Sequence, residues 1–203
     1  MVKLILASGS TRRQEILRTL GIEYSLLKCN VDETVEMMPP EDTVQTLAAR
    51  KCTAAKALLP CGNERFVVIS ADTVVSYENE IFGKPKDRED AVHMLSALSG
   101  IIHHVHTGIA VSDGCKMTVE SETTKVFFRE LSIDEINRYV DSGEPMDKAG
   151  AYGIQETGAL FVRKISGDYF NVVGLPVCRL GIILSRDFGI DLLALSEGNK
   201  RHS

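Results

Sequence analysis

The clearest structural signal in the chain is the segment Leu4-Ile-Leu-Ala-Ser-Gly-Ser-Thr-Arg-Arg-Gln-Glu-Ile-Leu17. Its apolar run, which ends at Ala7, predicts a buried strand. A helix is predicted directly after it, because Thr11 is suited to cap a helix and Gln14 lies three residues on, where a capping-box partner belongs. Gly21 provides the stop signal for this helix.

Two arginines fall in the first turn of the predicted helix, which is the unfavourable end for cations. A helix N-terminus carries a partial positive charge, so each misplaced cation costs roughly 0.3–1 kcal/mol. Arg12 and Arg13 gather there with free backbone N–H groups and the hydroxyls of Ser8, Ser10 and Thr11. An anion would satisfy all of these groups together, and phosphate is the usual occupant of such a site. The alternative is that both arginines simply point into solvent.

The composition is that of a soluble globular protein, with 203 residues, 44% hydrophobic and 25% charged. The net charge of -5 argues against broad non-specific binding to nucleic acid, and no apolar run approaches the ~20 residues of a membrane span. The five cysteines are scattered and form no CxxC, which fits reduced thiols in the cytoplasm better than disulfides or a zinc site. We expect one domain over residues 1–185 and a partly flexible C-terminal extension over residues 186–203.

Strands and helices are predicted to alternate along the rest of the chain. Strands are expected at residues 24–27, 66–70, 104–112, 117–128 and 159–165, with residues 74–77 open as a continuation of the strand 66–70. Helices are expected between residues 39 and 58, 87 and 100, 132 and 143, and 175 and 184. Asp113-Gly114 predicts a hairpin turn, which makes one pair of strands antiparallel. This pattern is typical of an α/β protein with a mixed sheet.

Two carboxylates are candidates for the chemistry. Asp72 follows closely on the predicted buried strand 66–70, and the ends of strands are where α/β sheets place ligand sites. A carboxylate there can hold Mg²⁺ or act as a base toward water, whereas the alternative is an aspartate in a turn or cap. Glu33 is a candidate second carboxylate of a metal site, with an exposed loop glutamate as the alternative.

Three further polar side chains are candidates for substrate contacts. Lys84 lies on a stiff loop between Gly83 and Pro85, where a cation can meet a phosphate oxygen. Lys51 lies close to the apolar stripe of its predicted helix and either snorkels outward or points into a pocket. Gln155 lies in an irregular, glycine-bearing loop and offers both a donor and an acceptor, which reading the edge of a base requires.

Several common site types are disfavoured. His103, His104 and His106 resemble a metal cluster, but in a strand His104 and His106 share one face while His103 takes the other. A neutral, core-lining role is therefore favoured for them. The chain contains no Walker A motif and no GxGxxG, so neither a P-loop ATPase nor a Rossmann dehydrogenase is indicated. Gly-x-Ser-x-Gly is also absent, so the local context does not support a Ser-His-Asp site.

Five segments together resemble the Maf family of nucleotide pyrophosphatases. They are Leu6-Ala-Ser-Gly-Ser-Thr-Arg-Arg13, Ala71-Asp-Thr73, Gly83-Lys-Pro85, Glu144-Pro-Met-Asp-Lys-Ala-Gly-Ala-Tyr-Gly-Ile-Gln155 and Gly167-Asp-Tyr-Phe-Asn-Val-Val-Gly-Leu-Pro176. They come in the family's order and span nearly the whole chain. The resemblance implies an ITPase-like (Maf/Ham1) α/β fold, with an elongated mixed sheet flanked by helices and two lobes around a central cleft, often in a homodimer.

The resemblance also implies an activity, a cofactor and roles for single residues. The activity is hydrolysis of nucleoside triphosphates between the α- and β-phosphates, and the cofactor is a divalent cation such as Mg²⁺ or Mn²⁺. The expected partner is therefore the nucleoside triphosphate substrate, and neither a nucleic-acid polymer nor a membrane is expected as a partner. Asp72 is implied as the general base, Glu33 and Asp72 as metal ligands, and Lys84 as a further catalytic residue. The implied phosphate and metal positions are Ser8, Ser10, Arg13, Glu33, Lys51 and Lys84, and Glu33 is also implied as a catalytic residue. Arg12, Thr73 and Gln155 occupy the positions that separate substrate classes, and they match the branch that resembles dTTP/UTP pyrophosphatases.

The chain departs from the family pattern at two places. Thr11 stands where the family has proline, and Ser70 stands where it has glycine, which adds a hydroxyl close to the implied base.

The alternative function is a nucleotide-binding regulator of cell division or growth with little turnover, because the same pocket residues would serve a sensor.

Overall fold

The computed structural model describes residues 2–59, 65–78 and 80–200. Its elements in chain order are β1 (Lys3–Leu6), α1 (Thr11–Thr19), β2 (Ser25–Leu26), α2 (Pro40–Ala57), β3 (Phe66–Tyr77), β4 (Glu80–Phe82), α3 (Arg88–Leu98), β5 (Ile102–Ser112), β6 (Met117–Phe128), α4 (Ile133–Asp141), the 3₁₀ helices η1 (Glu144–Asp147), η2 (Ala149–Ala151) and η3 (Thr157–Phe161), β7 (Val162–Ser166), α5 (Tyr169–Val173), α6 (Val177–Phe188) and α7 (Leu192–Lys200).

Within the described residues the strands form one seven-stranded sheet in the order β2-β1-β3-β5-β6-β7, and β4 pairs with β3. β1 runs parallel to β2 and β3, whereas the pairs β3–β4 and β6–β7 are antiparallel. The predicted α/β class with a mixed sheet flanked by helices is therefore confirmed.

The chain divides into two compact units. Unit 1 comprises Met1–Asp72, Thr107–Glu122 and Gly174–Ser203, and unit 2 comprises Thr73–His106 and Thr123–Val173. The predicted extension over residues 186–203 contains the end of α6 and all of α7, and the hydroxyl of Ser196 in α7 donates a hydrogen bond to the carbonyl of Leu20 at 2.6 Å. No described helix has the length and apolar character that crossing a bilayer requires.

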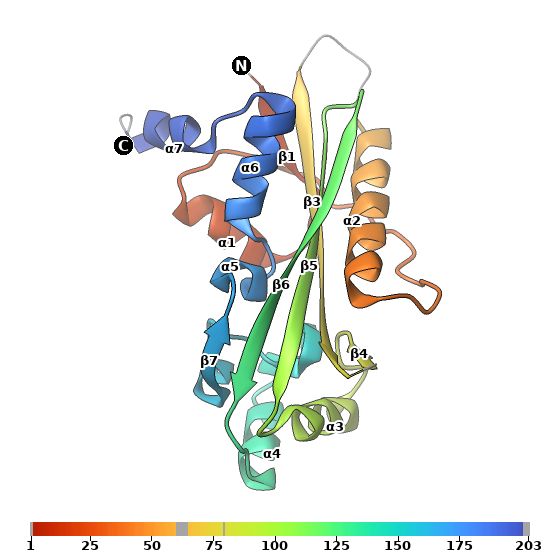
Figure 1. Cartoon of the computed structure of the whole chain (residues 1–203), viewed down its shortest axis with the longest axis vertical. Coiled ribbons are helices and arrows are strands. Elements are labelled where there is room, and N and C mark those ends of the chain that lie inside the picture. The colour runs from red at the N-terminus through yellow and green to blue at the C-terminus, as the bar shows by residue number, and fades with distance from the viewer. Residues whose placement is uncertain (1, 60–64, 79, 201–203) are drawn as a thin grey trace. The chain divides into compact units, whose positions relative to one another are not determined.

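In unit 1, α2 covers one face of the strands and α1 and α6 lie on the other (Figure 1). Strand β1 is buried on both faces, which is why its sequence is continuously apolar rather than alternating. Ile5 and Ala7 pack with Val68 and with Ala48 and Cys52 of α2 in one core cluster. Alternate strand residues point to opposite faces, so Leu4 and Leu6 face the other layer. The burial pattern thus fixes β1 in the middle of unit 1.

Gly108 lies where β5 meets the backbone of α2 most closely. A Cβ atom at this position would lie 2.3 Å from the carbonyl oxygen of Val44 and 2.7 Å from the backbone nitrogen of Gln45. Because both neighbours are main-chain atoms, they cannot turn aside as a flexible side chain would. The close packing of α2 on the sheet therefore depends on glycine at this position.

We expect Gly108→Ala to destabilise the protein by about 1–3 kcal/mol, the usual cost of overpacking a core. Thermal unfolding followed by circular dichroism measures this effect. Gly83→Ala is the matched control, because a Cβ atom at Gly83 would meet no atom of the described residues within 4 Å and its φ is not positive. Equal melting temperatures for the two variants would contradict the close approach of β5 and α2.

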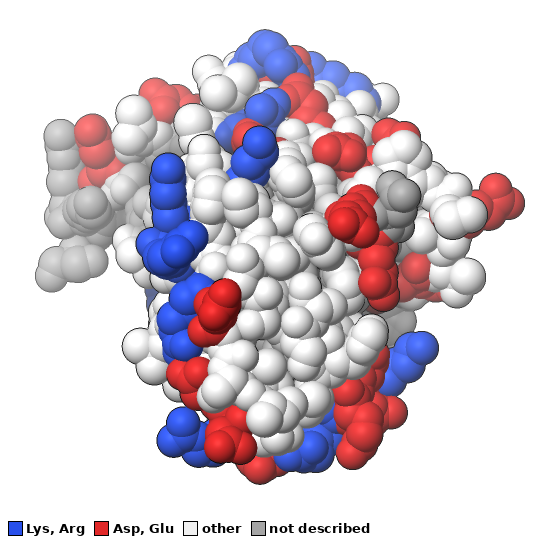
Figure 2. Space-filling model, turned by 60° about the horizontal axis from the view of Figure 1, so that its bottom comes forward, with Lys and Arg blue, Asp and Glu red and all other residues white. Residues whose placement is uncertain are grey.

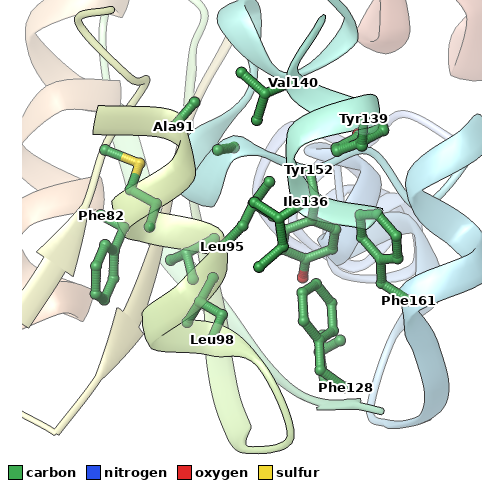
Figure 3. Packing of buried hydrophobic residues seen from close by; sticks show 14 of the residues in the cluster. Phe82, Ala91, Leu95, Leu98, Phe128, Ile136, Tyr139, Val140, Tyr152 and Phe161 are labelled. Atoms are coloured by element: carbon green, nitrogen blue, oxygen red, sulfur yellow. The ribbon is translucent and has the colours of Figure 1, made fainter. Parts of the chain in front are cut away.

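Unit 2 is built around a cluster of buried aliphatic and aromatic side chains. α3 packs against α4, and Leu95, Leu98 and Ile136 are among the residues that they contribute to the cluster. In Figure 3, Ile136 lies between the leucines of α3 on one side and the rings of Phe161 and Tyr139 on the other. α4 begins with a complete capping box at Ser132, as its sequence predicts.

His103 belongs to this core, as the alternation of the strand predicts. It is fully buried, and its ring meets Phe128 edge-on at 4.8 Å and Tyr152 at 5.4 Å. His104 and His106 stack on each other at 6.0 Å, as expected for residues on the same face of a strand. Among the residues that the structure describes, no group of three or more His, Cys, Asp or Glu side chains is arranged to hold a metal.

Candidate functional site

The N-terminus of α1 is capped by Ser10. Its backbone is extended, and its Oγ accepts a hydrogen bond from the backbone N–H of Arg13 at 3.5 Å. The prediction that Thr11 caps the helix is wrong, because Thr11 is already the first helical residue. A cap has to precede the helix and reach the N–H three residues on, and here Ser10 does both. Arg12 and Arg13 remain in the first turn, as predicted.

Arg13 is held in place from two sides. Its Nη1 donates to Ser8 Oγ at 3.3 Å, and its Nε donates to the carbonyl of Gly174 at 2.7 Å. Ser8 is buried and also accepts a hydrogen bond from the N–H of Ser10 at 3.1 Å. Gly174 has φ 118°, a conformation that favours glycine. Gly174 lies in one of the five segments that resemble the family, but no residue pattern predicts that its carbonyl orients an arginine.

The charges around Arg13 are close enough to affect its ionisation. Burial lowers the pKa of Arg13 below its ordinary value, and the charge of Arg12 lowers it further, whereas Asp72 and Glu33 act in the opposite direction. The alternative in which both arginines point into solvent is therefore wrong for Arg13. Its guanidinium belongs to the same electrostatic environment as the two candidate carboxylates.

Those two carboxylates converge on one lysine. The Nζ of Lys51, on α2, lies 2.5 Å from Asp72 Oδ1 and 2.6 Å from Glu33 Oε1. The side chains of Lys51 and Asp72 are only 16% and 12% exposed, while Glu33 approaches from an exposed loop at 61%. Of the two alternatives for Lys51, it points into the cluster rather than outward. Oxygens that reach the same nitrogen are close enough to share one cation.

The strand register explains why these groups meet. β1 and β3 are parallel with Leu6 opposite Ile69, so Ser8 is two residues and Asp72 three residues beyond the paired positions. The prediction that Asp72 lies just beyond the end of a strand is wrong, because Asp72 lies inside β3, which continues to Tyr77. β1 ends at Leu6 and gives way to α1, and this shorter neighbour leaves space beside Asp72 for the helix N-terminus.

Ser70, the departure from the family pattern, is accommodated by the main chain. Its hydroxyl is fully buried and donates to the carbonyl of Ala48 in α2 at 2.7 Å. Ser70 and Asp72 share a face of β3 because they are two residues apart. The additional hydroxyl therefore bonds to α2 one turn before Lys51 and satisfies its hydrogen-bonding capacity there.

The donor set of this cluster suits a hard divalent cation. Mg²⁺ and Mn²⁺ prefer carboxylate oxygens, and Mg²⁺ is commonly held by one or two carboxylates, water and substrate phosphates. Asp72 and Glu33 supply two such carboxylates directed at one point. The donor chemistry of these two carboxylates thus fits the implied metal.

The remaining predicted site residues belong to unit 2. Thr73 follows Asp72 in β3 and is half-buried. Lys84 is exposed in the segment between β4 and α3, and Gln155 is exposed in the turn between η2 and η3. Unit 1 contains the other seven, namely Ser8, Ser10, Arg12, Arg13, Glu33, Lys51 and Asp72.

On the face shown in Figure 2, acidic and basic side chains are mixed, and the surface is not uniformly basic. On the face drawn in Figure 2, Lys and Arg side chains lie beside Asp and Glu side chains, and a broad central area carries neither. Arg12 and Arg13 in the first turn of α1 and Lys51 beside Asp72 form a local group of cations in unit 1. Such a local cluster suits a small anion that brings a cation with it.

An α/β chain with hydroxyls and arginine at a helix N-terminus, beside two carboxylates, has the groups that bind a phosphate with its metal. The sequence comparison agrees in class: residues 3–186 match the profile of the Maf-like protein family, and the chain belongs to that family. It is 48% identical over 198 residues to the dTTP/UTP pyrophosphatase of Alkaliphilus oremlandii, covering 95% of this chain and 100% of the relative. It is 49% identical to the dTTP/UTP pyrophosphatase of Acetivibrio thermocellus, covering 95% of this chain and 98% of the relative.

Among solved structures, a HAM1 protein from Coxiella burnetii aligns with 79% of this chain and 92% of its own length. The TM-score is 0.42 and the sequence identity 14%, a similarity too distant to support a conclusion about this chain.

Proposed function

We propose that this chain is a nucleoside triphosphate pyrophosphatase that hydrolyses dTTP and UTP, and modified pyrimidine nucleotides, to the monophosphate and pyrophosphate. The observation that carries this proposal is the convergence of Asp72 and Glu33 on Lys51 in the unit that also holds Arg13 and Ser8 at a helix N-terminus. Relatives that share nearly half of its residues over their whole length bear the same functional name. We also predict a cytoplasmic location and a homodimer.

In this proposal the cations and the helix N-terminus bind the triphosphate. The N–H groups of the first turn of α1 and the guanidinium of Arg13 donate to phosphate oxygens, and Ser8 and Gly174 keep that guanidinium in one orientation. Lys51 and Lys84 add point charges. Because Ser8 and Gly174 orient the Arg13 guanidinium before the substrate arrives, this donor needs little reorganisation as charge develops on the phosphates.

Asp72 acts on the attacking water. A divalent cation held by Asp72 and Glu33 would neutralise phosphate charge and lower the pKa of a bound water. Asp72 accepts a proton from the water as its oxygen forms a bond to the α-phosphorus. The bond between that phosphorus and the bridging oxygen breaks, and pyrophosphate leaves with the bridging oxygen. An isolated aspartate is a weak base at neutral pH, and a cation held at this site would compensate by making the water more acidic.

Base selection is assigned to Arg12, Thr73 and Gln155. Thymine and uracil share a hydrogen-bonding edge that has carbonyl acceptors beside an N–H donor. The amide of Gln155 carries one acceptor and two donors, so it can complement that edge. A site that pairs with such an edge discriminates strongly against bases that leave its polar groups unpaired.

The test is pyrophosphate release from a panel of nucleoside triphosphates, with Mg²⁺ or Mn²⁺ and with a chelator. We expect preferred turnover of dTTP and UTP. We expect chelator to abolish that turnover, because it removes the cation that Asp72 and Glu33 would hold to neutralise the phosphate charge. Binding of nucleotides without release from any of them would overturn the enzyme proposal and favour the regulator. Full turnover in chelator would overturn the metal requirement alone.

A further inference from the structure

The turn that carries Gln155 is tied at both ends to Tyr139 and Glu144. Glu144 Oε1 accepts hydrogen bonds from the hydroxyl of Tyr139 at 2.8 Å and from the N–H of Gly158 at 3.1 Å. Its Oε2 accepts from the N–H of Thr157 at 3.2 Å. The Tyr139 hydroxyl accepts in turn from the N–H of Gly153 at 3.2 Å. We call this pair, Tyr139 and Glu144, the clamp.

Gly158 allows the two ends of the turn to touch, and Gly153 allows the side chain of Lys148 to pack beside the turn. A Cβ atom on Gly158 would lie 2.7 Å from both the carbonyl oxygen of Gly153 and the hydroxyl of Tyr139. A Cβ atom on Gly153 would lie 2.6 Å from Cε of Lys148. The chain therefore leaves at Gly153, passes through Gln155 and returns at Gly158 to pack against its own start. Such a closed turn has few conformations as long as its ends stay joined.

The clamp is anchored in the core of unit 2. Tyr139 is 4% exposed, and its ring meets that of Phe161 edge-on at 4.8 Å, as Figure 3 shows. Lys148 is also buried, and its Nζ donates to the carbonyl of Glu144 at 2.7 Å and to Asp147 at 2.9 Å. Gln155 itself is exposed, so its amide extends into solvent from a main-chain turn that the buried Tyr139 and Lys148 support from below.

The ionisation of the pair suits these hydrogen bonds. Burial raises the pKa of Tyr139, and its hydrogen bond to Glu144 raises it further, so the hydroxyl stays protonated and donates. Burial alone would raise the pKa of Glu144, but hydrogen bonds from Gly158, Tyr139 and Thr157 outweigh it, and the pKa lies below its ordinary value. Glu144 is thus an ionised acceptor at neutral pH, which makes each of its hydrogen bonds charge-assisted.

We propose that Tyr139 and Glu144 are positioning residues that set base selectivity by holding the Gln155 turn in one conformation. The inference rests on the proposed function, in which Gln155 contacts the base. A glutamine amide that turns over exchanges its donor and acceptor, so it can pair with the edge of cytosine as well as with that of thymine or uracil. The clamp fixes the main chain from which the Gln155 side chain extends, so it limits the positions and orientations in which this amide meets the edge of the nucleobase.

The test compares Tyr139→Phe and Glu144→Gln with the native chain in the ratio of kcat/KM for dTTP to kcat/KM for dCTP. We expect this ratio to fall about tenfold in each variant, as expected when a hydrogen bond worth about 1.4 kcal/mol is lost from base discrimination. The kcat for dTTP should change by less, because the phosphate-binding residues are untouched. Hydrogen exchange at the amides of Gly153, Thr157 and Gly158 should become faster in the same variants.

Two further variants separate the possible failures. Ser132→Ala removes the cap of α4 without touching the turn, so it should lower the melting temperature and leave the ratio unchanged. Gln155→Glu replaces the amide itself and should change the preferred base. If Gln155→Glu shifts the ratio and neither clamp variant does, the positioning inference is overturned and the proposed function stands. If Gln155→Glu leaves the preference unchanged, the role of Gln155 is wrong and the clamp inference falls with it. If Glu144→Gln fails to fold, Tyr139→Phe decides the question.

Discussion

Asp72→Asn is expected to lower kcat about 10³-fold, within the range by which a positioned base accelerates a reaction. Asparagine has the shape of aspartate, and its carbonyl oxygen can still accept the hydrogen bond from Lys51. It carries no charge, so it can neither take a proton from water nor balance a divalent cation. The variant therefore tests the charge of Asp72 and leaves the packing of β3 unaltered. The measurement is pyrophosphate release from dTTP with Mg²⁺.

A matched control removes a carboxylate from another ion pair. Asp141 on α4 pairs with Arg88 at 2.9 Å, and both side chains are about half exposed. Exposed pairs of this kind contribute little to stability, so Asp141→Asn should keep nearly full turnover and a nearly native melting temperature. Near-native turnover of Asp72→Asn would remove this residue from the chemistry. A large loss in both variants would point to a general effect of lost charge instead.

Local patterns predicted most of the fold because the forces that they report act locally. The apolar run before Ser8 and the glycine at position 21 mark β1 and the end of α1, and neither depends on distant residues. The cap was assigned one residue too late, since Ser10 and Thr11 are both good caps and only the backbone conformation distinguishes them. β3 runs on through residues 74–77, the continuation that the sequence left open, and Val75 and Tyr77 there pair with the neighbouring strand β4.

The candidate site could be predicted residue by residue, but the contacts within it could not. Glu33 and Lys51 each have an unremarkable alternative when considered alone. Their significance comes from meeting Asp72 at one nitrogen, which requires α2 to pack on β3 in a particular register. The clamp is even harder to predict from the sequence. No residue near Tyr139 in the chain indicates that its hydroxyl contacts the turn that begins at Gly153. Contacts of this kind depend on tertiary packing.

His103 is expected to make the stability of the protein fall as the pH is lowered below neutrality. Burial lowers its pKa from the ordinary value of 6.5 to about 3, and the charge of His104 adds to the effect. Its Nε2 lies 2.8 Å from the hydroxyl of Tyr152, and its Nδ1 is buried with no hydrogen-bond partner among the described residues. A second proton would therefore have no acceptor, so the folded protein keeps this ring neutral.

The sign follows from where each state binds the proton. The unfolded chain protonates His103 below about pH 6.5, and the folded chain does so only near pH 3, so the stabilisation is present above pH 6.5 and is lost as the pH falls between these values. From pH 6.5 to pH 5 the loss is about 2 kcal/mol in the free energy of unfolding. Urea unfolding at several pH values measures it. His103→Gln keeps a partner for Tyr152 and removes the titration, so its free energy of unfolding should fall less steeply, while His104→Gln, at a half-buried position on the opposite face, should keep the native slope. Equal slopes for native protein and His103→Gln would show that His103 is protonated in the folded state, contrary to its burial in the aromatic core.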